Sequence, residues 1–434
     1  MADKQKASDR SMADSSFAPD NESPTQEESV PKLLGVSIGI RLIFDSGVQL
    51  FNPFLPLIAT GLQISEVALG SLVGLRNLTG LIGPYFGALA DRRSYRLVMS
   101  LGLVLAGIGS IVVGLSSSWW LTVLAMVVWG VGMAAFTPSL HAYVSARLPY
   151  AQRARGIGIL EYSWALAGIV GLYLIGFLID WQGWRAPFFV LGTLMLLFSI
   201  VVWRFFSPLD RTPRSISPGR SQSSGIESNI QSEPVSESFI ERLKRFFDLG
   251  SNQISAYATM IGSTFLFFGA VQLMITHGLW LRTEYGFGAI QLGTVALIMG
   301  LADLCGSVSV SLFADRLGKR RSVIVGAVGA LLGYILMPSL NSSAYAAVAS
   351  LFFARSTFEF GIVSNISLLS EQVPEQRGKV FTLAGAFNLL GSATAGISGP
   401  WIYQQYGVSG LATLSGIVTI LCLFIYWIWV QDVE

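Results

Sequence analysis

The chain has few charged residues and almost no cysteine or histidine. Only 12% of its 434 residues are Asp, Glu, Lys or Arg, whereas a soluble domain carries about 25%. The two cysteines, Cys305 and Cys422, fall in separate apolar runs, which excludes a disulfide framework and a C-x-x-C metal site. The two histidines, His141 and His277, have no company at metal-ligand spacing. We therefore expect neither a metal nor a bound cofactor.

Signals for other protein classes are missing as well. The net charge of +2 is too small to indicate a nucleic-acid partner. No H-E-x-x-H, G-x-S-x-G or Walker sequence is present, so we expect no enzyme activity. Residues 1–32 are polar and contain no apolar segment of a cleaved signal peptide. They are predicted to form a disordered cytoplasmic tail.

Apolar residues, in contrast, are abundant and arranged in long runs. They make up 52% of the chain, and the mean hydropathy is +0.59. A run of about twenty apolar residues is long enough to cross a bilayer as a helix. Twelve such spans are predicted, at 33–59, 67–89, 97–116, 119–145, 155–179, 185–205, 254–280, 289–312, 322–340, 344–371, 378–404 and 409–430. The sequence therefore predicts an all-α membrane protein.

Lys and Arg are distributed unevenly over the connections between these spans. The odd-numbered connections carry only Arg185 and Arg282, whereas the even-numbered ones carry clusters such as Arg92, Arg93 and Arg96. Excess Lys and Arg marks the cytoplasmic side. Both termini are therefore predicted to be cytoplasmic, in a multi-pass protein of the plasma or inner membrane.

A Ser-rich segment at 206–253 separates the first six spans from the last six. Its composition cannot bury a core, so it is predicted to be a cytoplasmic linker. Its end, SFIERLKRFFDLG, is typical of a short helix on the membrane surface or of a lead-in to span seven. The linker divides the chain into six-helix bundles at 33–205 and 254–430, followed by a cytoplasmic end at 431–434.

The two halves repeat one another. GVQL at 47–50 corresponds to AVQL at 270–273, and EVALG at 66–70 corresponds to AIQLG at 289–293. GLRNLTG at 74–80 corresponds to GLADLCG at 300–306. The order and the nearly constant spacing indicate a duplication, which predicts two bundles related by an axis along the membrane normal.

One connection in each half resembles the signature of the major facilitator superfamily, G-x-L-A-D-R-x-G-R-R/K. The segments are GALADRRSYR at 87–96 and SLFADRLGKR at 311–320. The resemblance implies a fold of twelve transmembrane helices in two pseudo-symmetric bundles, closest to drug and metabolite efflux members driven by protons. It also implies that these loops latch neighbouring helices. The gating residues would be Gly87, Asp91, Arg92, Arg96, Asp315 and Arg316, and each Asp would accept from free backbone N–H groups.

Two other patterns of this family fit poorly. The position where the fourth helix often carries Arg is Met126. In the fifth helix Leu172 replaces the proline of the antiporter pattern G-x-x-x-G-P-x-x-G. Both departures weaken an assignment to proton-coupled drug efflux and leave the fold prediction unchanged.

Seven ionisable residues fall well inside the predicted spans, where a charge is costly and usually marks a functional path. The predicted charge partners are Arg41, Arg76 and Arg355, and the predicted proton-coupling acids are Asp303, Glu161, Asp45 and Glu359. Arg41 could hold Asp45 and Arg355 could hold Glu359, four residues further along each helix. Three cations face four acids, and a buried acid without a cation can exchange a proton. Asp303, Glu161 and Asp45 rank first, although purely structural helix-to-helix locks remain an alternative.

Polar and aromatic residues near these charges are candidates for a solute cavity. The resemblance implies that helices one, four, seven and ten line that cavity. The candidates are Gln49, Asn52, Trp164, Gln272, Phe268 and Asn365. For the aromatic residues, packing or lipid contact is the competing interpretation.

These observations predict a secondary transporter that moves a small organic solute by alternating access. Proton-coupled efflux of a lipophilic or cationic compound is favoured, and proton-coupled uptake of a metabolite is the alternative. A membrane scaffold or sensor is a remote alternative. The expected partners are the solute and membrane lipids, with no nucleic acid, and a monomer is expected.

Overall fold

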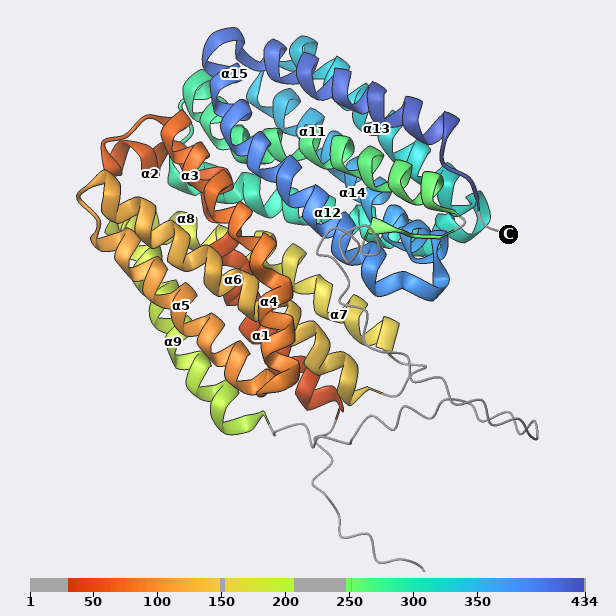
Figure 1. Cartoon of the computed structure of the whole chain (residues 1–434). Helices are drawn as coiled ribbons and strands as arrows, with labels where there is room; N and C mark the ends of the chain where they lie inside the picture. Colours follow the sequence, from red (N-terminus) through yellow and green to blue (C-terminus); the bar gives the residue numbers. More distant parts are fainter. Residues whose placement is uncertain (1–29, 149–152, 207–246, 251, 433–434) are drawn as a thin grey trace, which may run out of the picture.

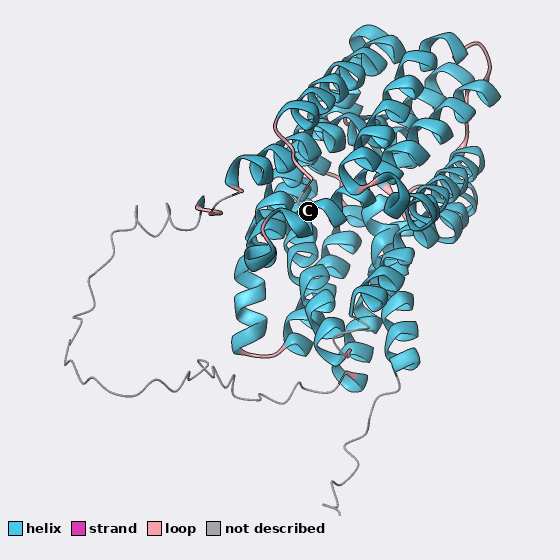
Figure 2. Ribbon diagram, turned by 90° about the vertical axis from the view of Figure 1, so that its right-hand side faces the viewer, coloured by secondary structure: helices cyan, strands magenta, loops and turns pink. Residues whose placement is uncertain are grey.

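The computed structural model describes residues 30–148, 153–206, 247–250 and 252–432. Within these ranges the chain is helical and has no strand (Figure 2). Nearly all of the expected tail and linker, with the possible surface helix before span seven, lies outside the described residues. The helices form two groups that follow the order of the sequence, red to green and green to blue (Figure 1).

The first group comprises the helices that precede the linker. They are α1 (Val30–Gln49), α2 (Phe51–Leu62), α3 (Glu66–Leu78), the 3₁₀ turn η1 (Thr79–Ile82), α4 (Gly83–Arg92), α5 (Tyr95–Leu115), α6 (Trp119–Arg147), α7 (Arg153–Leu166), the π-helical turn η3 (Ala167–Leu172), α8 (Tyr173–Gln182) and α9 (Ala186–Phe205).

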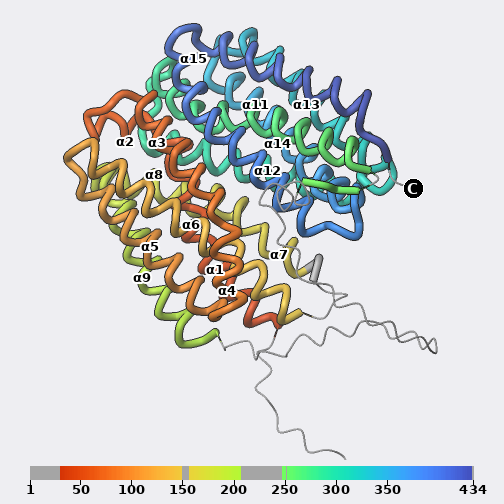
Figure 3. Tube along the Cα trace, viewed as in Figure 1, coloured from red at the N-terminus to blue at the C-terminus, as the bar shows by residue number. Residues whose placement is uncertain are grey.

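The second group follows the linker and has longer, less interrupted helices (Figure 3). They are α11 (Gln253–Tyr285), α12 (Ala289–Leu317), α13 (Lys319–Leu340), α14 (Ala344–Gln372), the 3₁₀ turn η4 (Pro374–Gln376) and α15 (Arg377–Ile428).

These elements make twelve crossings. Nine helical segments of the described chain are long and apolar enough to cross a membrane, and the pair α1 and α2, bent by 53°, makes a tenth. α15 has 52 residues and is interrupted at Gly407, where φ is 64°, so it supplies two crossings. The segment from α3 through η1 to α4 completes the set and matches the predicted span 67–89. The fold prediction is thus confirmed.

Local signals in the sequence explain where several helices begin. Ser65 accepts from the backbone N–H of Ala68 at 3.1 Å and caps α3. Ser343 caps α14 in the same way through Ala346, at 3.3 Å. These caps satisfy backbone donors that the first turn of a helix leaves free.

The two groups, called here the first and second half, meet at the end of the bundle opposite the basic loops. Near the Leu62–Ser65 and Tyr285–Gly288 turns, α3 packs against α15, α2 against α11, and α8 against α12. Across this contact Gln404 Nε2 donates a hydrogen bond to Glu66 Oε2 at 3.0 Å. α4, which leads to the basic end, packs instead against α5, α6 and η1 of its own half.

Repeated glycines make this contact close. A Cβ atom on Gly74 would lie 2.6 Å from the carbonyl oxygen of Ala393 on α15. Its counterpart in the repeat, Gly300, would meet the carbonyl oxygen of Ala165 on α7 at 2.7 Å. The glycines that revealed the duplication therefore have the same task in each half, since small residues let membrane helices approach closely.

Candidate functional site

Two adjoining cavities lie between the halves. The first, called here the Arg76 cavity, has a volume of about 150 Å³. Its lining includes Asn52, Arg76, Asn77 and Trp164 from the first half and Phe358, Glu359 and Ser392 from the second. The second, called the Arg355 cavity, has a volume of about 50 Å³. Both are lined by Asn52, Met274, Arg355 and Phe358.

Arg76, on α3, is a buried cation without a carboxylate partner among the described residues. Only 2% of the residue is exposed. Its Nη2 donates to the Val48 carbonyl at 3.1 Å and to Asn77 Oδ1 at 3.3 Å. Its Nε and Nη1 have no hydrogen-bond partner in the described structure. The guanidinium carbon lies 5.1 Å from the Phe51 ring centre and 5.6 Å from that of Trp129, which offsets part of the cost of burying the charge.

Glu359 lies near the middle of α14 and has no cationic partner among the described residues. Its Oε1 accepts from the hydroxyl of Ser307 on α12 at 3.2 Å. A Cβ atom on Gly306 would lie 2.6 Å from the Cβ of Glu359, so the glycine makes room for this side chain. Glu359 is therefore the acid left over from the count of three cations and four acids.

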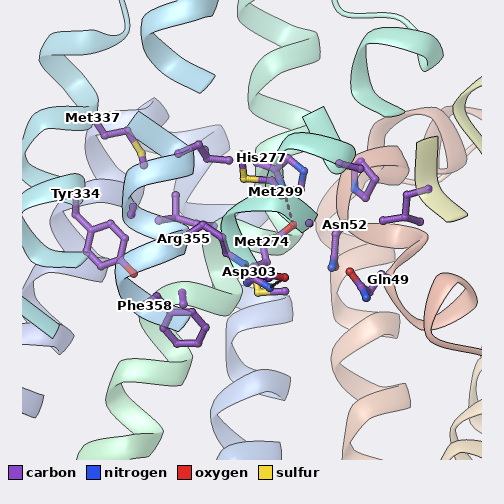
Figure 4. A pocket seen from close by; sticks show the side chains of 18 residues that line it. Gln49, Asn52, Met274, His277, Met299, Asp303, Tyr334, Met337, Arg355 and Phe358 are labelled. Atoms are coloured by element: carbon purple, nitrogen blue, oxygen red, sulfur yellow. Dashed lines mark hydrogen bonds and ion pairs between the residues drawn. The ribbon is translucent and has the colours of Figure 1, made fainter. Parts of the chain in front are cut away.

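The spacing along α14 predicted that Arg355 would pair with Glu359. Arg355 pairs instead with Asp303. Its Nη2 donates to Asp303 Oδ2 at 2.8 Å, and its Nε donates to Oδ1. Figure 4 shows the pair at the centre of the Arg355 cavity, with Gln49 and Asn52 reaching in from the first half. A carboxylate on a neighbouring helix can present both oxygens to the planar guanidinium, which makes it the better partner.

In the first half, two acids and a histidine gather around Arg41, whereas Arg76 lies apart from them. The expected pair with Asp45 is present at 3.2 Å. Glu161, expected to lack a cation, accepts from both terminal nitrogens of Arg41 at 2.7 and 2.8 Å. His141 Nε2 lies 2.8 Å from Glu161, and Ser163 donates to Asp45 at 2.7 Å. Asp303 and Glu161 therefore both have cations, which removes the reason for ranking them above Glu359 as proton carriers.

The predicted solute contacts divide into two groups. Gln49 and Asn52 line the Arg355 cavity, and Asn52 and Trp164 line the Arg76 cavity. Gln272, Phe268 and Asn365 are absent from both linings. Gln272 donates to Ser415 at 2.8 Å, and Asn365 accepts from Tyr426. These two side chains bind α15, and only knowledge of the helix packing shows that they face it.

Four polar lining residues were not among the predicted contacts, namely Asn77, His277, Tyr334 and Ser392. Asn77 donates to Ser392 across the halves at 2.7 Å. His277 has Nδ1 2.7 Å from the Met274 carbonyl, so this nitrogen carries the hydrogen and Nε2 is left as an acceptor. The repeat position shared by Asn77 and Asp303 was the only signal in the sequence that pointed to Asn77.

The predicted gating residues lie on the basic end. Asp91 accepts from the hydroxyl of Tyr95, and this is the hydrogen bond seen in place of the expected backbone cap. Arg96 stacks over Trp203 at the end of α9, 4.5 Å from the ring centre. Its repeat counterpart, Arg320, donates to the carbonyl of Trp427 at the end of α15 at 2.8 Å. Gly87 and Arg92 lie on α4, and Asp315 and Arg316 lie in the last turn of α12, so these residues stand on helices and not in the connecting loops. Their latch function stays a prediction.

Comparison with known proteins identifies the family. The sequence profile described as Major Facilitator Superfamily matches residues 38–364 and 259–434, which together span nearly the whole described chain. The chain belongs to the major facilitator superfamily. It is therefore a multi-pass membrane transporter and not an enzyme, as predicted.

Individual relatives are distant but cover most of the chain. An uncharacterized MFS-type transporter of Bacillus subtilis, YwfA, is 25% identical, with 90% of each chain covered. The multidrug resistance protein MdtG of Proteus mirabilis is 22% identical over 88% of this chain and 92% of that protein. The cis,cis-muconate transport protein of Acinetobacter baylyi is 25% identical over 82% and 83%.

A solved structure shows the same fold. The crystal structure of a D-xylose-proton symporter superposes with a TM-score of 0.70 at 18% identity, covering 92% of this chain and 97% of that one. At this identity the likeness supports the twelve-helix architecture alone.

Proposed function

We propose that this transporter couples the movement of a small organic solute to protons, with the solute in the Arg76 cavity and the proton on Glu359. The observation that carries the proposal is that two charged residues of this cavity, Arg76 from the first half and Glu359 from the second, have no ion-pair partner among the described residues. A nearby cation favours the ionised form of an acid, so an acid in an ion pair takes up a proton only with difficulty. Glu359 has no such partner and can gain and lose a proton. A proton gradient then supplies the driving force, and no bound cofactor is needed.

Alternating access follows from where the halves touch. The contact at the end opposite the basic loops closes the site there, and rocking of the halves would open it and close the basic end. The A-D-R loops at Asp91 and Asp315 would latch the helices in one of these states. The positive-inside rule places this basic end, with both termini, in the cytoplasm of a plasma-membrane protein. The protein would work as a monomer in lipid.

Two directions of coupling are candidates. Efflux by antiport, the sequence-based expectation, is supported by the multidrug resistance name of the relative from Proteus mirabilis. It requires that solute and proton exclude one another, as a cationic solute at Glu359 would do. Uptake by symport is favoured by Arg76. An anionic solute beside Arg76 binds better when Glu359 is protonated, because an ionised Glu359 repels it.

The proposal is tested in proteoliposomes that carry a pH gradient. After a screen has found a transported solute, Glu359→Gln should reduce gradient-driven accumulation of that solute by at least about tenfold. Glu371→Gln is the matched control, since Glu371 is on the same helix but binds Lys319 at the basic end. The direction follows from whether an inward or an outward proton gradient drives accumulation. Full accumulation by Glu359→Gln would overturn the assignment of the proton to this residue.

A further inference from the structure

We propose that the Arg76 cavity binds the carboxylate group of a small organic anion, with the Arg76 guanidinium as its partner. This rests on the proposed function, because it names the solute class for the same site. It departs from the lipophilic or cationic solute that the sequence favoured.

The first argument is the uncompensated charge. A guanidinium stays protonated at any physiological pH, and a buried charge is costly unless it is paired. Every carboxylate ion-paired with a buried arginine in the described structure belongs to Arg41 or Arg355. The Arg76 guanidinium lies against the rings of Phe51 and Trp129. Its two hydrogen-bond acceptors are neutral, and both accept from Nη2. Its Nε and Nη1 still need acceptors.

The second argument is the lining and size of the free space. Arg76 lines the cavity, which also presents the amide of Asn52 and the rings of Trp164 and Phe358. An anion fits this mixture of one unpaired cation, the ion-paired Arg355, amide donors and aromatic walls. A volume of about 150 Å³ matches engineered apolar cavities of about that size, which hold benzene. The solute is therefore a compact carboxylate with an apolar body.

The third argument is the position of the remaining acid. Glu359 lines the same cavity, but no ion pair joins it to Arg76 in the described structure. A cation beside Glu359 would leave Arg76 uncompensated and would add a further positive charge to a cavity that already contains Arg76 and Arg355. An anion beside Arg76 compensates the positive charge of that residue, and protonation of Glu359 removes the negative charge of the acid.

Three probes of nearly equal size separate the solute classes. Benzoate, benzamide and benzylamine are anionic, neutral and cationic near neutral pH. Binding to the full-length protein, purified in detergent, is followed through the rise in its melting temperature. We expect stabilisation by benzoate, and none by benzamide or benzylamine. No proton gradient is involved, so this result stands apart from the test of proton coupling.

Two kinds of variant test the role of Arg76. Asn77→Asp places a carboxylate where the amide oxygen already lies 3.3 Å from Arg76 Nη2. It should neutralise Arg76 and weaken benzoate binding by at least about tenfold, as Arg76→Gln should. Arg76→Lys keeps the charge and should retain part of the affinity. The matched control is Asn388→Asp, whose side chain accepts from Ser263 at 3.4 Å outside the cavity lining.

Several results would overturn the inference. One is equal protection by benzoate and benzamide, or preference for benzylamine. Another is unchanged benzoate binding in Asn77→Asp, which keeps the Arg76 side chain and tests the charge even if Arg76→Gln does not fold. A third is the absence of protection by benzoate at millimolar concentration. A transporter that couples a neutral or cationic solute to protons would contradict this inference and leave the proposed function intact.

Discussion

In the first half, both acids of the Arg41 cluster are paired with that arginine, whereas the second half leaves one acid outside its ion pair. Arg41 binds both Asp45 and Glu161. Arg355 binds Asp303 alone, and Glu359 accepts only from a serine among the described residues. The two clusters are built on different spans, one and five against eight and ten, so they are not copies of one ancestral site.

The glycines, in contrast to the charged residues, are equivalent in the two halves. Gly74 and Gly300 occupy equivalent positions and both allow close contact between the halves. At the next equivalent positions the halves diverge, because Arg76 and Asn77 stand where the second half has Ala302 and Asp303. Duplication thus preserved the packing of the bundle and changed its charges. This asymmetry gives the cavity a free cation from one half and a free acid from the other.

The largest difference between the clusters should appear in stability. Asp303→Asn leaves Arg355 buried without a carboxylate and should lower the free energy of unfolding by about 3–5 kcal/mol. Asp45→Asn should cost clearly less, because Arg41 keeps Glu161. Thermal unfolding in detergent measures both, and Asp303→Asn with Arg355→Gln should recover much of the loss. Equal costs for the two single variants would contradict the contrast between the clusters.

Bulky replacements of the repeated glycines should break the packing that the halves share. Gly74→Val and Gly300→Val overpack the contact and should disfavour it by about 1–3 kcal/mol, a population change of about 5- to 150-fold. Spin labels at positions 66 and 404, in a variant without Cys305 and Cys422, report the separation of the halves. Gly39→Val is the control, since Gly39 is exposed on α1 and a Cβ there meets nothing within 4 Å. An unchanged label distance in both variants would refute this function of the glycines.

Glu161 should matter less to stability than Asp303. Its side chain is 49% exposed, and Arg41 retains Asp45 when Glu161 is removed. Glu161→Gln should therefore cost about 1–2 kcal/mol, at the low end of the value of about 1.5–3 kcal/mol for hydrogen bonds to a charged group, because solvent screens a half-exposed carboxylate. The same unfolding assay applies, and a loss as large as that of Asp303→Asn would show that the first cluster is no more redundant than the second.

The smallest effects are expected at the basic end. Arg96 stacks on α9 and Arg320 caps the last carbonyls of α15, so equivalent residues hold the last span of each half by different contacts. Arg96→Gln and Arg320→Gln should each cost about 0.5–1 kcal/mol. Arg321→Gln, an exposed neighbour, should cost nothing measurable. A cost above that of Glu161→Gln would contradict this ranking.

The sequence predicted the fold well because apolar length and the repeat are local signals. The twelve spans, the A-D-R loops and the chain break near Gly407 could all be read from the order of residues. The 53° bend between α1 and α2 was not predicted, although Pro53, which has no backbone N–H to donate to the turn before it, is a signal for the break in the sequence.

The site could be predicted only in part because partners on other helices decide it. Spacing along one helix identified the Arg41–Asp45 pair correctly and assigned the wrong acid to Arg355. The count of three cations and four acids correctly indicated one spare acid, but Arg76 also turned out to be without a carboxylate. Which residues remain free depends on how α3, α12 and α14 face one another.

The most direct test of the central claim compares two assays on one preparation of Glu359→Gln. Exchange of solute across the membrane needs only rocking of the loaded protein, whereas accumulation against a gradient also needs proton release and uptake at Glu359. The account predicts that exchange continues near the wild-type rate while accumulation driven by the pH gradient is lost. Accumulation at the wild-type level, or loss of both activities in a folded variant, would contradict it.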